Sequence, residues 1–123
     1  MLSKNILEEK SYRYALHIAV FCKRFIEEKH EYVLSKQLMK SGTSVGANIQ
    51  EALHAESKLD FIHKLSIALK EAYESKFWIL IICDSGYETK NGVKLLFDES
   101  LEIIALLTSI IKTTKANLQK ASN

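Results

Sequence analysis

The sequence predicts an all-α protein, built as an up-and-down antiparallel four-helix bundle. The chain has 123 residues with no proline and only four glycines, so it lacks the breakers that a β-rich fold needs at its turns. Apolar residues recur three and four positions apart along four long segments, as on one face of a helix. The stretches between these segments are short, and short connections make consecutive helices antiparallel neighbours. We therefore expect a single domain over residues 1–123, large enough to bury a core without disulfides or metal.

The first two helices are expected from about Asn5 to Lys29 and from about Ser35 to Glu56. Ser35 is expected to be the N-cap of the second helix, because its hydroxyl can accept from a free backbone N–H. The stripe expected to face the core in the first helix comprises Tyr12, Ala15, Ile18, Ala19, Cys22, Phe25 and Ile26. In the second helix it comprises Leu38, Gly42, Val45, Ile49, Ala52 and, as a polar last member, Glu56.

The third helix is expected to open with the capping-box pattern Ser57-Lys58-Leu59-Asp60 and to run to about Asp84. Gly86 is the expected stop, because glycine tolerates the left-handed conformation that commonly follows a helix. The residues that recur at helical spacing here are Phe61, Leu65, Ala68, Leu69, Ala72, Lys76, Ile79, Leu80 and Cys83.

The fourth helix is expected to begin between Asn91 and Asp98 and to run to about Leu118. Its core stripe comprises Leu96, Ile103, Ile104, Leu107, Ile110 and Ile111.

The second helix carries a further stripe of mostly short polar side chains, about 100° from its apolar one. A solvated helix face is usually rich in Lys and Glu, so short side chains indicate close approach of another helix, from the same or a neighbouring chain. The mid-helix glycines Gly42 and Gly46 favour the same interpretation, because each costs about 1 kcal/mol of helix propensity. The residues expected at this oligomer or helix-packing interface are Ser41, Ser44, Gly46, Asn48 and Glu51.

The charge pattern gives a weaker signal. Net charge is +2, and Arg13 and Arg24 are the only arginines, which disfavours specific base readout. The lysines that are candidate nucleic-acid contacts are Lys36, Lys40, Lys64, Lys70, Lys112 and Lys115. A solvated face is the more common role of such lysines, and those near the end of the last helix also complement its dipole. Tyr73, Phe77 and Trp78 could stack on bases, although packing anchors are the more common role of aromatic residues.

Catalytic and metal chemistry finds little support in the chain. Glu27-x-x-His30 and Glu51-x-x-His54 have the spacing used by di-metal bundle proteins, but antiparallel helices place the two motifs at different levels. Asp60-x-x-His63 has ligand spacing without a further ligand. No nucleophile motif or phosphate-binding glycine loop is present. We expect no catalytic residue, no metal, no cofactor and no enzymatic activity.

The remaining signals favour a cytoplasmic protein. Cys22 and Cys83 each lie in an apolar helical stretch without a CxxC partner, so two buried reduced thiols are expected. The opening MLSKNILEEK has no apolar signal core, and no apolar run is long enough to span a membrane.

Three motifs in the segment from Tyr32 to Ile79 resemble a known family. They are LSKQL at 34–38, SVGANIQEA at 44–52 and FIHKLSIALKEAYE at 61–74. These match the hallmark elements of the four helix bundle protein family, also called the large-subunit ribosomal RNA intervening-sequence protein family. Asn48 and Glu51 fall in its N-I-x-E core.

The resemblance implies a bacterial cytoplasmic four-helix bundle, a ring-shaped homopentamer and no enzymatic activity. A related branch is the accessory protein of diversity-generating retroelements, which binds a reverse transcriptase and nucleic acid. That branch is strongly basic, and the net charge of +2 departs from it.

Three functions follow as hypotheses. The first is a homo-oligomeric scaffold, pentameric by the resemblance, whose partner is RNA, DNA or a nucleic-acid-processing protein. The second is a structural protein of an intervening-sequence element without a strong ligand. The third, which the geometry disfavours, is a metal-dependent bundle enzyme.

Overall fold

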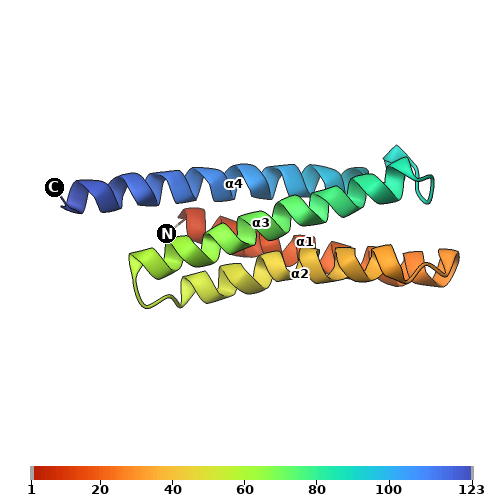
Figure 1. The fold of residues 1–123 in the computed structure, drawn as a ribbon, viewed down its shortest axis with the longest axis horizontal. Coiled ribbons are helices and arrows are strands. Elements are labelled where there is room, and N and C mark those ends of the chain that lie inside the picture. The colour runs from red at the N-terminus through yellow and green to blue at the C-terminus, as the bar shows by residue number, and fades with distance from the viewer. Residues whose placement is uncertain (1, 123) are drawn as a thin grey trace.

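Four antiparallel helices form a single elongated bundle in the computed structural model, which describes residues 2–122 and the side chains of residues 6–121. The helices are α1 (Leu2–Lys29), α2 (Val33–Leu53), α3 (Lys58–Asp84) and α4 (Lys90–Ser122). Each helix contacts its neighbours in chain order, and α1 also contacts α4, which closes the bundle (Figure 1). No strand lies within residues 2–122. The predicted up-and-down four-helix bundle is confirmed.

The start of α2 differs from the prediction. Ser35 lies two residues inside the helix and is not its N-cap. The Glu31 carboxylate accepts hydrogen bonds from the backbone N–H groups of Val33, Leu34 and Ser35 at 2.9–3.1 Å. The Ser35 hydroxyl donates to the Glu31 carbonyl at 2.7 Å. An acid before a helix satisfies free N–H groups and complements the dipole, so Glu31 takes the role predicted for Ser35.

The N-cap residue and the glycine stop predicted for α3 are confirmed, although the Asp60 carboxylate accepts from the Glu56 backbone N–H and not from that of Ser57 as in a full capping box. The Ser57 hydroxyl accepts from the Asp60 backbone N–H at 3.0 Å. At the other end Gly86 adopts a φ of 89° and donates to the Cys83 carbonyl, while Tyr87 donates to the Ile82 carbonyl. This pair of hydrogen bonds is a Schellman motif, and its left-handed residue favours glycine.

Helix α4 begins earlier than expected, at Lys90. The Thr89 hydroxyl accepts from the Gly92 backbone N–H at 3.0 Å and caps the helix. Spacing of apolar residues could not reveal this first turn, because Lys90, Asn91 and Gly92 are all exposed.

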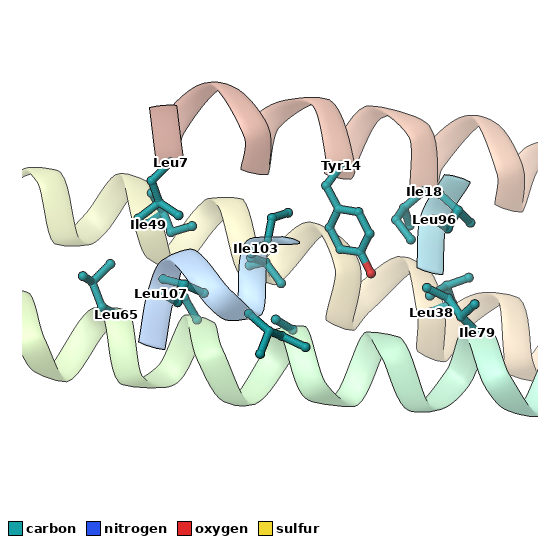
Figure 2. Close-up of a cluster of buried hydrophobic side chains, with 14 of the residues drawn as sticks. Leu7, Tyr14, Ile18, Leu38, Ile49, Leu65, Ile79, Leu96, Ile103 and Leu107 are labelled. Atoms are coloured by element: carbon teal, nitrogen blue, oxygen red, sulfur yellow. The ribbon is translucent and has the colours of Figure 1, made fainter. Parts of the chain in front are cut away.

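The core runs along the length of the bundle and receives side chains from all four helices (Figure 2). The stripes predicted for α2 and α4 are confirmed from Leu38 to Ala52 and from Leu96 to Ile111, with Ile110 half-buried. The predicted extension of α2 and its stripe to Glu56 was wrong, because α2 ends at Leu53 and Glu56 is exposed. In α1 the prediction was partly wrong. Ile18, Cys22 and Phe25 are buried as predicted, but Tyr12 is 68% exposed, and Tyr14 is buried instead.

The prediction for α3 was also partly wrong, because Leu80 is exposed. Ser75 and Ile82 occupy buried positions of that helix instead.

A buried hydrogen bond fixes the relative height of α1 and α3, which run in the same direction. The Tyr14 hydroxyl lies 2.7 Å from Ser75 Oγ, and the Tyr14 ring points into the core (Figure 2). Ser75 also donates to the Ala72 carbonyl at 2.8 Å, so its single proton is used there and Tyr14 is the donor to Ser75. Residues 61 positions apart on α1 and α3 therefore lie at about the same height along the bundle.

Helix α2 approaches α1 closely at its two glycines. A Cβ on Gly42 would lie 2.9–3.1 Å from side-chain carbons of the buried Ile18. A Cβ on Gly46 would lie 3.4 Å from the Ser11 carbonyl oxygen. Close approach at these two positions is made by a helix of the same chain.

Candidate assembly surfaces

Helix α1 has a second apolar stripe on the face that points away from the core. Tyr12, Leu16 and Val20 are four residues apart and are 68%, 48% and 58% exposed. Their spacing places them on one side of the helix, opposite the buried Ile18. Single exposed apolar residues are ordinary, but a contiguous exposed row marks a contact surface. These three residues are named the α1 stripe below.

A second apolar surface lies where α3 and α4 meet. Tyr73, Phe77 and Leu80 on α3 and Leu101 on α4 are each roughly half exposed. Beside them is a groove of about 520 Å³, where the apolar Leu80, Val93 and Phe97 lie among charged and polar residues that include Asp84, Lys94 and Asp98. The Phe77 and Trp78 rings pack edge to face, with centroids 5.1 Å apart. The exposed residues and the groove are named the α3–α4 face below.

Sequence reasoning missed most of these residues. Tyr12 and Leu80 were assigned to the core, and Leu16, Val20 and Leu101 were assigned to no surface. A signal was present in α1, because its apolar residues form two stripes on opposite sides. A helix of a four-helix bundle needs only one such stripe for its own core.

Polar contacts lie at the edges of both borders between α1 and its neighbours. Between α1 and α4, His17 Nδ1 lies 2.9 Å from both oxygens of the Glu99 carboxylate, and Lys10 pairs with Glu102. Between α1 and α2, the Gln50 amide donates to Glu8 at 2.7 Å. These interactions fix α1 against the bundle and leave its outer stripe free.

The residues predicted for an interface on α2 have varied positions. Ser41 is buried and Ser44 half-buried, and each donates its hydroxyl to a backbone carbonyl of its own helix. The Asn48 amide donates to the Ser44 carbonyl at 2.8 Å. Glu51 is exposed and accepts from Lys64 of α3 at 2.8 Å, and Gly46 packs on α1. Gly46 is therefore in a helix-packing contact, while Ser44, Asn48 and Glu51 lie on one side of α2, at least partly exposed.

The six candidate nucleic-acid lysines are not gathered into one patch. Lys36 and Lys40 lie in the first half of α2, whereas Lys112 and Lys115 lie near the opposite end of the bundle, on α4 (Figure 1). Lys70 is exposed on α3. The partner of Lys64 is Glu51, and this hydrogen bond raises the pKa of the Lys64 ammonium.

Lys40 belongs to an electrostatic cluster with two acids of α3. Burial raises the pKa of the Glu71 carboxyl, the neighbouring Glu74 adds to that rise, and Lys40 opposes it. Lys40 therefore has acidic neighbours, which makes it a weaker phosphate contact.

Groups that could hold a metal are dispersed. Among the residues that the structure describes, no three His, Cys, Asp or Glu side chains gather closely enough for a metal ion. The motifs at Glu27 and Glu51 lie at opposite ends of the bundle, because α1 ends where α2 begins. Both cysteines are free thiols, with Cys22 buried and Cys83 half-buried beside the α3–α4 groove. None of the described helices combines the length and the apolar character that crossing a membrane requires.

Comparison with known proteins identifies the family. The family profile described as 23S rRNA-intervening sequence protein matches residues 3–109. The chain belongs to the 23S rRNA-intervening sequence protein family. The resemblance noted from the 34–38, 44–52 and 61–74 motifs is thereby confirmed.

A similar solved structure belongs to a protein of unknown function. It is a crystal structure from Bacteroides thetaiotaomicron, described as a protein with unknown function from the S23 ribosomal protein family. Its sequence is 44% identical, the alignment covers 89% of this chain and 98% of that one, and the TM-score is 0.87. No curated protein matches this member of the intervening-sequence family.

Proposed function

We propose that this intervening-sequence family protein is a non-enzymatic, homo-oligomeric scaffold of the cytoplasm, assembled as a pentamer. The single observation that carries the proposal is the α1 stripe. Tyr12, Leu16 and Val20 lie in a row on a helix whose other sides are already packed against α2 and α4. A helix with a core stripe and an opposite apolar stripe has one more contact surface than an isolated bundle uses.

The experiment compares two valines that are both exposed on a helix. Val20 lies in the α1 stripe, and Val33 is 69% exposed in the first turn of α2, outside both surfaces. Val20→Lys and Val33→Lys add the same charge at sites of similar exposure. Light scattering after size exclusion gives the mass of each variant and of the wild-type chain, over a range of protein concentrations.

We expect the wild-type chain and Val33→Lys to elute at close to five times the 14.0 kDa chain mass. Val20→Lys should give a lower mass at the same concentration, with an unchanged helical circular-dichroism spectrum. A lysine ammonium would have to be desolvated in the contact, which opposes assembly. A wild-type chain that elutes as a monomer at every concentration would refute the proposal.

A second candidate function is binding of nucleic acid at the end of α4. Beyond Glu102 this helix carries no acid, and Lys112, Lys115 and Lys120 are all exposed. The C-terminal turns of α4 project past the connection between α2 and α3 (Figure 1). Lysines on a projecting helix end can approach a phosphate backbone without hindrance from the rest of the bundle.

This second function is tested by fluorescence anisotropy with structured RNA and duplex DNA across a salt series. Lysine–phosphate contacts predict sub-micromolar binding that weakens steeply as salt rises. A variant in which Lys112, Lys115 and Lys120 are replaced by Gln should bind more weakly, whereas the control Lys36→Gln/Lys40→Gln should bind like wild type. If neither nucleic acid binds at low salt, this function is wrong, and pull-downs for a protein partner become the next step.

A further inference from the structure

The α1 stripe and the α3–α4 face match each other in height along the bundle. The Tyr14–Ser75 hydrogen bond places residues 61 positions apart on α1 and α3 at about the same level. By this offset Tyr12 lies level with Tyr73 and Leu16 level with Phe77. Val20 lies level with the segment that contains Leu80. Tyr12 and Leu16 thus have exposed apolar counterparts at their own levels, and Val20, level with the half-buried Ile81, lies one residue from the level of the exposed Leu80.

The exposed charges beside the two surfaces are opposite in sign at the same heights. Glu9 is level with Lys70, Arg13 with Glu74 and Lys23 with Asp84. All six side chains are exposed. Among the described residues, Lys23, Lys70 and Asp84 form no ion pair within their own chain, whereas Arg13 pairs with Glu9. Three oppositely charged pairs at matching levels constitute charge complementarity between the two surfaces.

The two surfaces cannot meet within one chain. Helices α1 and α3 are diagonal neighbours that meet through core side chains such as Tyr14 and Ser75, because α2 and α4 lie between their backbones and the bundle closes through α1–α4. The α1 stripe also points away from the core, on the far side of α1 from α3.

We propose that the α1 stripe of one copy packs on the α3–α4 face of a second copy, with the two bundles parallel and not shifted along their long axes. The proposal rests on the self-assembly proposed above and adds which surfaces meet. A rotation about an axis parallel to the bundle keeps every residue at its height and keeps α1 parallel to α3. It therefore brings Leu16 against Phe77, Arg13 against Glu74 and Lys23 against Asp84. Because the two surfaces differ, the contact is heterologous, and repeated rotation closes a ring.

Disulfide trapping tests this contact directly. Leu16→Cys and Phe77→Cys are introduced singly and together in a Cys83→Ser background, and Cys22 stays because it is buried. After mild oxidation, the double variant should give a ladder of covalent oligomers on a non-reducing gel. Each single variant should remain a monomer on that gel, because the contact presents only one cysteine.

The outcomes separate this inference from the proposed function. Dimers of the Leu16→Cys single variant would show that α1 meets α1, and the inference would be wrong. No ladder from the double variant, with a wild-type chain that is oligomeric by light scattering, would also overturn it while leaving the scaffold intact. A monomeric wild-type chain would refute both.

Charge reversal provides a second readout with exposed residues only. Lys23→Asp and Asp84→Lys should each raise the concentration at which the oligomer half-dissociates, by about fivefold. The double variant Lys23→Asp/Asp84→Lys should restore the wild-type value, because the pair is re-formed with its signs exchanged. Additive losses in the double variant would contradict a Lys23–Asp84 contact.

Discussion

Tyr14 is the largest fully buried side chain among the described residues, and its hydroxyl has one partner in the core. Burial raises the pKa of this hydroxyl, because the phenolate would lose its hydration. Ser75 accepts from Tyr14 and donates to the Ala72 carbonyl, so both hydroxyl groups are satisfied. The chain of hydrogen bonds joins α1 to α3 across the core.

These two hydrogen bonds predict that removing the Tyr14 hydroxyl and removing the Ser75 hydroxyl lower the free energy of unfolding by unequal amounts. Tyr14→Phe leaves Ser75 bonded to Ala72 and should lower the free energy of unfolding by about 1 kcal/mol. Ser75→Ala leaves the buried Tyr14 hydroxyl without a partner and should cost more, up to about 3 kcal/mol. Urea unfolding at one fixed protein concentration measures both. A larger cost for Tyr14→Phe would contradict the assigned donor.

Cys22 predicts a loss of stability at high pH. Burial raises the pKa of its thiol from 9.0 to about 11 in the folded chain. Below pH 9.0 the thiol is neutral in the folded and the unfolded chain, so its contribution to the free energy of unfolding is fully present. Between pH 9.0 and 11 the thiol ionises in the unfolded chain but stays neutral in the folded one, so the free energy of unfolding falls. The loss is on the order of 2 kcal/mol.

The measurement is the slope of unfolding free energy against pH for wild type and Cys22→Ala. Cys22→Ala is less stable overall through lost packing, but it should show a shallower fall over that range. Equal slopes would show that the thiol does not ionise on unfolding.

At the scale of single helices, caps and core stripes were predictable wherever one local rule acts alone. Ser57 and Gly86 obey such rules, because a hydroxyl acceptor and a left-handed residue have few substitutes at helix ends. The prediction of Ser35 as an N-cap was wrong because Glu31, four residues earlier, offers a stronger acceptor to the same N–H groups. The prediction of Tyr12 as a core residue was wrong because α1 is apolar on two sides, and spacing alone does not determine which side faces the core.

The α1–α2 contact gives a prediction at the level of elements. Gly42→Ala should destabilise the bundle by about 1–3 kcal/mol, because its Cβ would press on the branched, buried Ile18. Gly46→Ala has ordinary contact distance to Ser11 and should be neutral or stabilising by up to about 1 kcal/mol through helix propensity. Thermal unfolding of the two variants checks this, and equal shifts in Tm would contradict the close approach at Gly42.

At the scale of the whole molecule, the bundle has more apolar surface than its own core uses. The short side chains of α2 predicted close approach of another helix, from the same or a neighbouring chain, and the structure shows that Gly42 and Gly46 of that helix pack on α1 of the same chain. The surfaces that carry the proposed assembly are instead the α1 stripe and the α3–α4 face. Neither could be assigned from sequence, since exposure depends on how each helix is rotated about its axis.

The fixed alignment of α1 and α3 suits them to serve as complementary surfaces. Parallel helices of one bundle hold fixed relative heights, here through Tyr14 and Ser75. Side chains on their outer faces are therefore pre-aligned for a neighbour related by rotation. Pre-alignment of this kind lowers the ordering cost of assembly, because no segment has to rearrange.

Native mass spectrometry of the unmodified chain measures the proposed pentamer without any substitution. We expect one dominant species, close to five times 14.0 kDa, that persists on dilution into the low-micromolar range. A chain that is monomeric throughout would contradict the proposed pentamer, because the α1 stripe would then be exposed to water in the functional protein.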